Sequence, residues 1–254
     1  MRVVILGGTW LAEPPDLASA SHLHAERASW PEHRAAIAGF RPDAAVDVAA
    51  LNGQGADDAL RALPDGLRLV ALTSVDVYRA AVLRLGAVYG EHDYQHRLEF
   101  ILRRVRAGRT KIPFGAGTVL FSRVYVGDVA TAVAAAVETT VGEGGAFNVV
   151  ESATPSIRLL AGQILAAAGS DAELVSVPDQ VLPADLRSTG AGAQALLADA
   201  SKARQHLGWH ESDPEQALRR TIDWHLRNPL SSSWPRNGVP GLRDRHDSLP
   251  LSYA

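Results

Sequence analysis

Short runs rich in valine, isoleucine and leucine alternate along most of this chain with segments that have helical spacing. The first run, Arg2–Leu6, ends at the pair Gly7-Gly8. Strands that helices cover on both faces read as continuous apolar runs of this kind. The alternation therefore predicts an α/β fold with a doubly wound parallel sheet. The expected strands are Arg2–Leu6, a weak strand at His22–Ala25, Ala45–Ala50, Leu67–Thr73, Ala81–Leu85, Arg123–Val126, Ala146–Val150 and Ala172–Val177.

Amphipathic spacing and capping residues predict the helices. Ser29–Glu32 has the pattern of a capping box, with Pro31 in the first turn, and opens a helix that ends near Gly39. Asp213 caps a last helix that Pro229 ends. Other helices are expected near residues 57–63, 95–107, 128–141, 154–169 and 201–207.

The order of these elements predicts three parts of the chain. Residues 1–145 are expected to form the sheet domain, and residues 146–229 a small C-terminal α/β lobe, with some segments interleaved between the two. Residues 230–254 are rich in Ser, Pro, Arg and Asp, which is typical of a flexible tail.

Composition narrows the class of protein. With 254 residues, 46% of them hydrophobic, the chain can bury a full core, and its net charge of −3 gives no reason to expect nucleic acid or an anionic membrane as partner. The absence of cysteine excludes disulfides, thiolate zinc sites and a cysteine nucleophile. The smooth apolar run Val129–Val137 is too short to cross a bilayer, and Met1–Leu6 already reads as a strand. We expect a cytoplasmic protein that acts on a small molecule.

Six segments, in order along the chain, carry a resemblance to a known family. They are VVILGGT at 3–9, LVALTSVDVY at 69–78, VLRLGAVYGEHDYQHRL at 82–98, FSRVYVGDVATAV at 121–133, GAFNVVES at 145–152, and ASKARQHLGW at 200–209 followed by PEQALRRTIDWHLRNP at 214–229. Together they resemble the extended short-chain dehydrogenase/reductase family, the NAD-dependent epimerases and dehydratases. The resemblance implies a Rossmann-like sheet, an NAD(P) cofactor, a substrate cleft beside the C-terminal lobe and, in many relatives, a homodimer.

The glycine turn departs from the family pattern. By resemblance, Gly7, Gly8 and Thr9 bind the cofactor, but the frame continues with Trp10 and Glu13 where the family has glycine or another small residue. The dinucleotide fingerprint needs glycine so that the pyrophosphate can approach the backbone and the helix can pack on the strand. The indole of Trp10 and the carboxylate of Glu13 hinder the approach of the pyrophosphate and the packing of the helix. The sequence therefore predicts that NAD(P) binding is weakened or lost.

The region after this turn is also shorter than in the family. Only residues 14–21 separate Glu13 from His22, too few for a crossover helix, a second strand and a loop. Residues 22–27 resemble the end of the family's third strand. Glu26 and Arg27 would then border the adenine pocket, or lie on a surface loop.

The catalytic pair of the family is missing. Its chemistry depends on a Tyr-x-x-x-Lys pair, yet none of the five tyrosines here stands four residues before either of the two lysines. After Tyr78 the next expected strand begins at Ala81, which leaves no room for the helix that carries this pair. Losing a general acid–base group typically costs about 10²–10⁴ in rate.

Three residues after the strand at 67–73 retain polar groups. Ser74 matches the family's catalytic Ser or Thr, Asp76 falls where sugar-nucleotide dehydratases have an acid, and Tyr78 follows. The carboxyl ends of parallel strands are where open α/β sheets bind ligands, so this trio is a candidate catalytic site. The alternative is that Ser74 and Asp76 cap a turn while Tyr78 packs in the core.

Three arginines are candidates for substrate binding. Arg84, Arg97 and Arg123 lie near segments that line the substrate cleft in the family, and a guanidinium can bind phosphate or carboxylate in two-pronged fashion. The spacing of His92 and His96 resembles that of metal ligands on a helix, but the family has a polar loop here without metal, so no metal site is predicted.

Three hypotheses on function follow. The first is a divergent epimerase/dehydratase-like protein that acts on a small polar metabolite. The second is a non-catalytic relative that binds a ligand or a partner. The third is a cofactor-independent isomerase, lyase or cyclase that uses Ser74, Asp76 and Tyr78.

Overall fold

The structure is a computed structural model of the full chain. It describes residues 1–7, 23, 25–48, 53–72, 81–93, 95–139, 145–182, 186 and 195–229. The predicted tail at 230–254 lies outside these residues. Within them, no helix combines the length and the apolar character that a membrane span requires.

The main sheet has five parallel strands in the order β1-β2-β3-β4-β8. The α/β class with a Rossmann-like parallel sheet is thus confirmed. The five predicted apolar runs form these strands with small shifts at their ends: β1 (Val3–Leu6), β2 (Ala44–Asp47), β3 (Arg68–Leu72), β4 (Ala81–Leu85) and β8 (Ala146–Val149).

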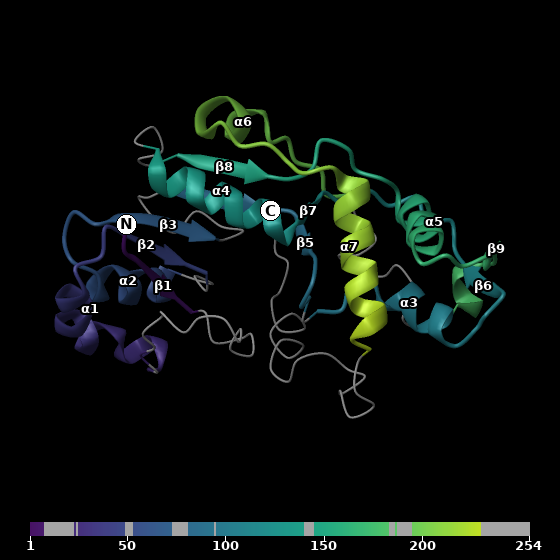
Figure 1. The fold of residues 1–254 in the computed structure, drawn as a ribbon, viewed down its shortest axis with the longest axis horizontal. Coiled ribbons are helices and arrows are strands. Elements are labelled where there is room, and N and C mark those ends of the chain that lie inside the picture. Colours follow the sequence, from purple (N-terminus) through teal and green to yellow (C-terminus); the bar gives the residue numbers. More distant parts are fainter. Residues whose placement is uncertain are drawn as a thin grey trace, which may run out of the picture.

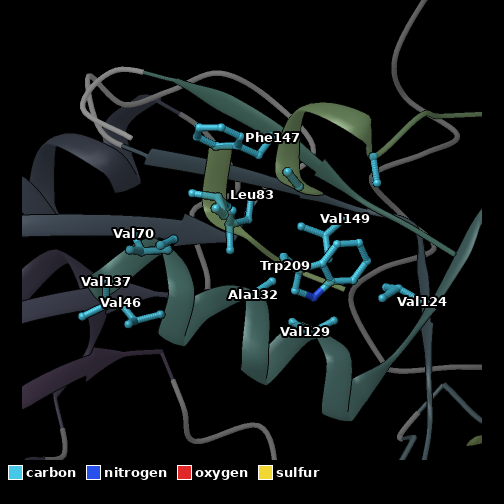
Figure 2. Close-up of a cluster of buried hydrophobic side chains, with 14 of the residues drawn as sticks. Val46, Val70, Leu83, Val124, Val129, Ala132, Val137, Phe147, Val149 and Trp209 are labelled. Carbon is cyan, nitrogen blue, oxygen red and sulfur yellow. The ribbon is translucent and has the colours of Figure 1, made fainter. Parts of the chain in front are cut away.

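Different helices cover the two faces of this sheet. One face packs against a 3₁₀ helix, η2 (Arg27–His33), and against α1 (Arg34–Phe40) and α2 (Gly53–Ala62). The other face packs against α4 (Val126–Glu138) and α6 (Ser201–Leu207). Figure 2 shows the buried Trp209 between α4 and this face of the sheet, beside Val129 and Ala132 of α4.

A second core forms the other end of the molecule. It packs α3 (Glu99–Arg106), α5 (Ile157–Ala167) and α7 (Pro214–Arg227) against the parallel pair β6 (Lys111–Phe114) and β9 (Glu173–Ser176). The short helix η4 (Asp179–Val181) follows β9. In Figure 1 this core lies on the right, α1 and α2 lie on the left, and the parallel pair β5 (Ala87–Tyr89) and β7 (Arg123–Tyr125) lies between.

The segments that form the main sheet and those that form the second core alternate along the chain. β8, the first strand after residue 145, pairs with β4 in the main sheet. Conversely, α3 and β6, which precede residue 145, pack in the second core.

The helix expected from Ser29 to Gly39 begins differently. It starts as η2 at Arg27 and becomes α-helical only at Arg34. Ser29 lies inside η2, where its hydroxyl donates to the Glu26 carbonyl, so the predicted capping box is wrong. Pro31, which has no N–H to donate, lies within this 3₁₀ segment.

The N-terminal side of the sheet ends at β1 within the described residues. β1 is the first strand in the sheet order and pairs there with β2 alone, while the side chain of Ile5 is 64% exposed. Leu23 and Ala25 lie in no strand, contrary to the weak strand expected at 22–25. His22 and His24 lie outside the described residues.

Candidate functional site

The predicted catalytic trio cannot be placed, but the strands around it can. Ser74, Asp76 and Tyr78 lie outside the described residues and stay predictions. β3 and β4 on either side are parallel neighbours, with Leu72 opposite Leu83. Only residues 73–80 connect them, and this stretch contains no lysine. A helical crossover between parallel strands usually takes about a dozen residues or more.

A buried polar cluster lies where β5, β7 and the end of β8 meet. Arg123 donates from Nε to Glu151 at 2.8 Å, and the Tyr89 hydroxyl donates to the other Glu151 oxygen at 2.6 Å. The guanidinium of Arg123 also lies 5.0 Å from the centre of the Tyr89 ring. All three residues are at least nine-tenths buried, and within the described residues Nη1 of Arg123 has no hydrogen-bond partner.

This cluster holds Tyr89 in its neutral form. Burial, followed by the charge of Glu151, raises the pKa of the Tyr89 phenol well above its ordinary value of 10.0. The phenol therefore stays protonated near neutral pH. It can donate a hydrogen bond, but it cannot serve as a base.

A second cluster of the same kind lies nearer the surface. Tyr125, opposite Tyr89 in the β5–β7 pair, donates to the Glu91 carboxylate at 2.8 Å, and Arg220 of α7 lies 3.4 Å from the same carboxylate. Burial and the hydrogen bond to Glu91 raise the pKa of Tyr125 to about 12. Both phenols therefore stay protonated near neutral pH.

The three candidate arginines occupy three different elements. Arg84 lies in β4 beside Asn148 of β8, and Arg123 belongs to the buried cluster. Arg97 follows the loop after β5, where Asp93 accepts from its guanidinium at 2.9 Å and from its backbone N–H. The structure does not test whether they bind a substrate, so this stays a prediction.

The histidines of the loop before α3 pack against α7. The ring of His92 lies 4.4 Å from that of Trp224, and His96 lies edge-on to the buried His225 at 6.4 Å. His225 Nε2 lies 3.0 Å from the carbonyl oxygen of Gly90. Across the described part of the chain, no three His, Cys, Asp or Glu side chains are grouped so that they could hold a metal.

At the carboxyl end of β2, Arg27 binds a buried carboxylate. Asp47 ends β2 next to Leu6 of β1 and is 0% exposed. Arg27 donates from Nη1 and Nη2 to its two oxygens at 3.1 and 2.5 Å, and from Nε to the Gly55 carbonyl at 3.0 Å. The Arg27 guanidinium also lies 4.5 Å from the centre of the Trp30 ring. We call Arg27, Asp47 and the Gly55 carbonyl the Arg27 clamp.

Three of the five candidate cofactor-binding residues, Gly7, Glu26 and Arg27, lie within the described residues. Gly7 has the positive φ of 88° that a tight glycine turn uses, while Gly8 and Thr9 lie outside the described residues. Glu26 stands directly before η2 and makes backbone contacts with Ser29. Arg27, the other candidate for the adenine pocket, is held by Asp47 and Gly55.

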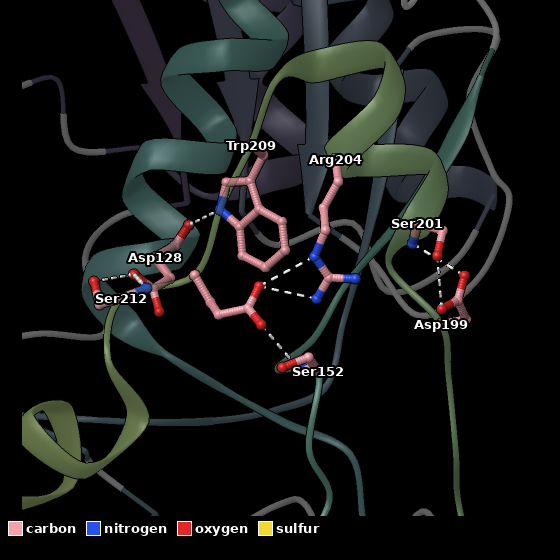
Figure 3. Close-up of polar contacts among 8 residues, drawn as sticks. Asp128, Ser152, Asp199, Ser201, Arg204, Trp209 and Ser212 are labelled. Carbon is pink, nitrogen blue, oxygen red and sulfur yellow. Dashed lines mark hydrogen bonds and ion pairs between the residues drawn. The ribbon is translucent and has the colours of Figure 1, made fainter.

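The C-terminal motifs form contacts that sequence analysis left unassigned. The Trp209 indole donates to the Asp128 carbonyl at 2.9 Å, and the Ser212 backbone N–H donates to the Asp128 carboxylate at 3.0 Å (Figure 3). Arg204 of α6 binds Glu211, which also accepts from the Ser152 N–H. Despite its partial burial, these hydrogen bonds and the charge of Arg204 lower the pKa of Glu211 to about 2. These contacts fix the segment after α6 against α4 and against the chain just beyond β8.

Two residues of these clusters carried a signal in the sequence. Asp47 is the last residue of the buried strand β2, and Glu151 follows the end of β8 by two residues. A carboxylate in that position must be paired, because burying an unpaired charge is costly. The identity of the partners, 20 and 28 residues away along the chain, was not visible from spacing.

Residues 69–149 match the model of the NAD dependent epimerase/dehydratase family. No curated protein matches the sequence. This match confirms, over residues 69–149, the resemblance that the motifs carry, and the parallel Rossmann-like sheet agrees with it.

Several solved structures have the same fold. UDP-glucose 4-epimerase of Thermotoga maritima, solved with UDP-glucose, is 18% identical with a TM-score of 0.64, over 89% of this chain and 91% of its own. The enzyme WbmG of Bordetella bronchiseptica, in complex with NAD and UDP, is 18% identical with a TM-score of 0.66, over 94% and 91%. RMD of Pseudomonas aeruginosa, complexed with NADPH, is 16% identical with a TM-score of 0.65, over 89% and 100%.

Proposed function

We propose that this protein is a divergent relative of the epimerases and dehydratases that binds a small polar metabolite at the carboxyl edge of β3, β4 and β8 and lacks the family's hydride-transfer cycle. The observation that carries the proposal is the short connection between β3 and β4. Paired parallel strands joined by residues 73–80 leave no place for the helix with the Tyr-Lys pair.

The tyrosines near this edge support the same conclusion. A base must lose its proton near neutral pH, and the pKa values of Tyr89 and Tyr125 are both raised above 10.0. Each phenol is held by a glutamate. They can orient a ligand or a strand, but they do not replace the missing catalytic phenolate.

The edge nevertheless retains features of a binding site. Arg123 and Glu151 keep a buried, charge-balanced pair beside the ends of β4 and β8, and Ser74 and Asp76 follow β3 in the sequence. Open α/β sheets bind their ligands at this edge. The position of Ser74 and Asp76 also favours the alternative of a cofactor-independent isomerase, lyase or cyclase, in which they would move protons.

Ligand screening on the full-length protein tests the proposal. Sugar nucleotides, sugar phosphates and hydroxy acids are added one at a time, and stabilisation is measured by thermal shift and then by calorimetry. We expect a ligand whose affinity falls about tenfold or more in Ser74→Ala or Asp76→Ala, the size of one lost hydrogen bond. Thr110→Ala is the matched control, because Thr110 is exposed and lies directly before β6, away from this edge.

The outcomes separate the hypotheses. Binding that neither substitution at 74 or 76 weakens would place the ligand elsewhere and contradict the proposal. Conversion of a bound ligand that is lost in both variants would favour the isomerase, lyase or cyclase. Binding without conversion would favour the non-catalytic relative.

A further inference from the structure

The guanidinium of Arg123 is used differently from that of Arg27. In the Arg27 clamp, Nε, Nη1 and Nη2 all donate to oxygens of the protein. Arg123 donates to Glu151 from Nε, whereas its Nη1 is buried and has no hydrogen-bond partner within the described residues. A buried N–H group without an acceptor is unfavourable, so an oxygen of a ligand would be stabilised beside Nη1.

Arg123 lies at the carboxyl ends of β4 and β8. The N–H of Glu151 donates to the Arg123 carbonyl at 2.8 Å, and the N–H of Gly86, directly after β4, donates to the Val149 carbonyl of β8 at 3.2 Å. A Cβ atom at Gly86 would lie 2.7 Å from the Ser122 carbonyl oxygen, so the two backbones approach closely at this point. The backbone that carries Arg123 is therefore held in place at the edge where the ligand site is proposed.

The carboxylate of the cluster already has its donors. Oε2 of Glu151 accepts from Arg123 at 2.8 Å, and Oε1 accepts from the Tyr89 hydroxyl at 2.6 Å. The group that this cluster can offer to a ligand is therefore a donor, the N–H of Arg123 Nη1. A ligand that binds there must supply an acceptor oxygen.

The charges of the buried side chains determine which kind of acceptor is favourable. In this part of the described structure Arg123 is the buried cation, while Glu151 and Asp128 are carboxylates that are 3% and 2% exposed. Asp128 accepts from the N–H and hydroxyl of Ser212, which carry no charge. Burial and Glu151 raise the pKa of Tyr89 most, and the charge of Asp128 raises it further, so Asp128 lies within electrostatic reach of the cluster. A phosphate or carboxylate here would add a buried negative charge that no further cation compensates.

We infer that the ligand group bound by Arg123 is an uncharged oxygen, a hydroxyl or carbonyl of the kind that a sugar or polyol presents, and not a phosphate or a carboxylate. An unpaired guanidinium favours anions because of its charge. Here Glu151 already neutralises that charge, and the remaining N–H selects a neutral acceptor. The inference rests on the proposed ligand site at this edge and names the class of group that the site accepts.

Matched sugars test the inference on the wild-type protein. Glucose, galactose and mannose are each compared with the corresponding uronic acid, in which a carboxylate replaces the hydroxymethyl group, and binding is measured by saturation-transfer NMR. We expect a neutral sugar to bind about tenfold or more tightly than its acid, because the acid adds a charge. An acid that binds as tightly as its neutral partner would overturn the inference. Binding of neither kind would contradict the proposed function for sugars, and the charge balance is then decided by the next experiment.

A single substitution tests the charge balance without any sugar. Glu151→Gln keeps the length of the side chain but removes the negative charge that compensates Arg123. Millimolar phosphate, compared with chloride at equal ionic strength, is expected to raise the melting midpoint of this variant by several degrees and that of the wild type by less than about 1 °C.

Glu215→Gln is the matched control for this substitution. It removes an exposed carboxylate that pairs with Arg219 on α7, and its response to phosphate should equal that of the wild type. Equal phosphate shifts in Glu151→Gln and the wild type, whether large or absent, would overturn the inference. If Glu151→Gln cannot be purified, the comparison of sugars with their acids on the wild-type protein decides.

Discussion

The two ends of the sheet's carboxyl edge each hold an ion pair between an arginine and a buried carboxylate, and the two pairs are built differently. Arg123 and Glu151 come from the segments FSRVYVGD and FNVVES, both within stretches that resemble the family. Arg27 comes from a short 3₁₀ helix in the region that departs most from the family, and it reaches Asp47 at the end of β2. One pair lies in the family-like half of the protein and the other in the shortened half.

The difference shows how a shortened α/β protein can complete its core. In the half that contains β4, β8 and α4, the family motifs pack as a continuous core, and the link from Trp209 to Asp128 joins α4 to the chain after α6. In the other half, η2 and α2 pack on a sheet whose described part ends at β1. There the ion pair between Arg27 and Asp47 joins η2 to the end of β2, and Arg27 also donates to the Gly55 carbonyl of α2. The ligand site proposed above lies beside β8, in the half that resembles the family.

The largest effect is expected from Arg123→Met. The substitution keeps much of the apolar stem but leaves Glu151, which is 3% exposed, with only the neutral Tyr89 as its hydrogen-bonding partner in this cluster. Removing one member of a buried ion pair costs about 3–5 kcal/mol of unfolding free energy. Chemical denaturation measures this loss. A loss below about 1 kcal/mol would mean that the Arg123–Glu151 pair contributes no more than a surface pair, and the comparison would fail.

The sequence predicted the sheet better than the site, for a physical reason. A strand that is buried on both faces consists of a continuous run of apolar residues. For this reason β1 to β4 and β8 were predicted to within a few residues. Asp213 also caps α7 as expected, accepting from the N–H groups of Glu215 and Gln216. The short strands β5 and β6 were missed, because β5 begins only two residues after the end of β4, and Lys111 and Pro113 interrupt the apolar pattern of β6.

The polar clusters could not be read from the sequence in the same way. Tyr89 and Glu151 are 62 residues apart, and Arg27 and Asp47 are 20 apart, so only the folded topology brings them together. Arg27 and Arg123 were singled out from the resemblance as ligand-binding residues. The structure shows that each of them pairs with a buried carboxylate of the protein. The resemblance identified the positions, but the partners follow from the strand ends.

Trp209→Phe is expected to have the next largest effect. Phenylalanine keeps an aromatic ring in the core that packs on α4, but it removes the donor to the Asp128 carbonyl. The Asp128 carbonyl still accepts from the Thr131 hydroxyl at 2.9 Å, so we expect the loss of one hydrogen bond, about 0.5–1.5 kcal/mol, and denaturant unfolding will show it. Trp224→Phe is a useful control, since Trp224 lies on α7 and contacts His92 and His225 by its ring. A larger loss in the control than in Trp209→Phe would show that the family-like half does not depend on this link.

A smaller, pH-dependent effect is expected at the loop before α3. Burial lowers the pKa of His96 below 6.5, and His225 lowers it further, although the charges of Asp93 and Glu99 act in the opposite direction. Below about pH 6.5 the unfolded chain therefore binds a proton at His96 that the folded protein does not. The stability contributed by neutral His96 is present above that pH and is lost as the pH falls toward its folded pKa. The melting midpoint of His96→Gln should fall less between pH 7 and pH 5 than that of the wild type, and an identical pH profile would show that His96 is not involved.

The smallest effect is expected where the buried cluster has its exposed counterpart. Arg220 and Glu91 repeat around Tyr125 the arrangement that Arg123 and Glu151 make around Tyr89, but the Arg220 side chain is 70% exposed. Water screens such a pair, so Arg220→Met is expected to change the unfolding free energy by less than about 1 kcal/mol. Denaturation of Arg220→Met and Arg123→Met under the same conditions compares one chemical arrangement at two depths. If the two losses were equal, burial would not explain a difference in stabilisation between the Arg123–Glu151 pair and the Arg220–Glu91 pair.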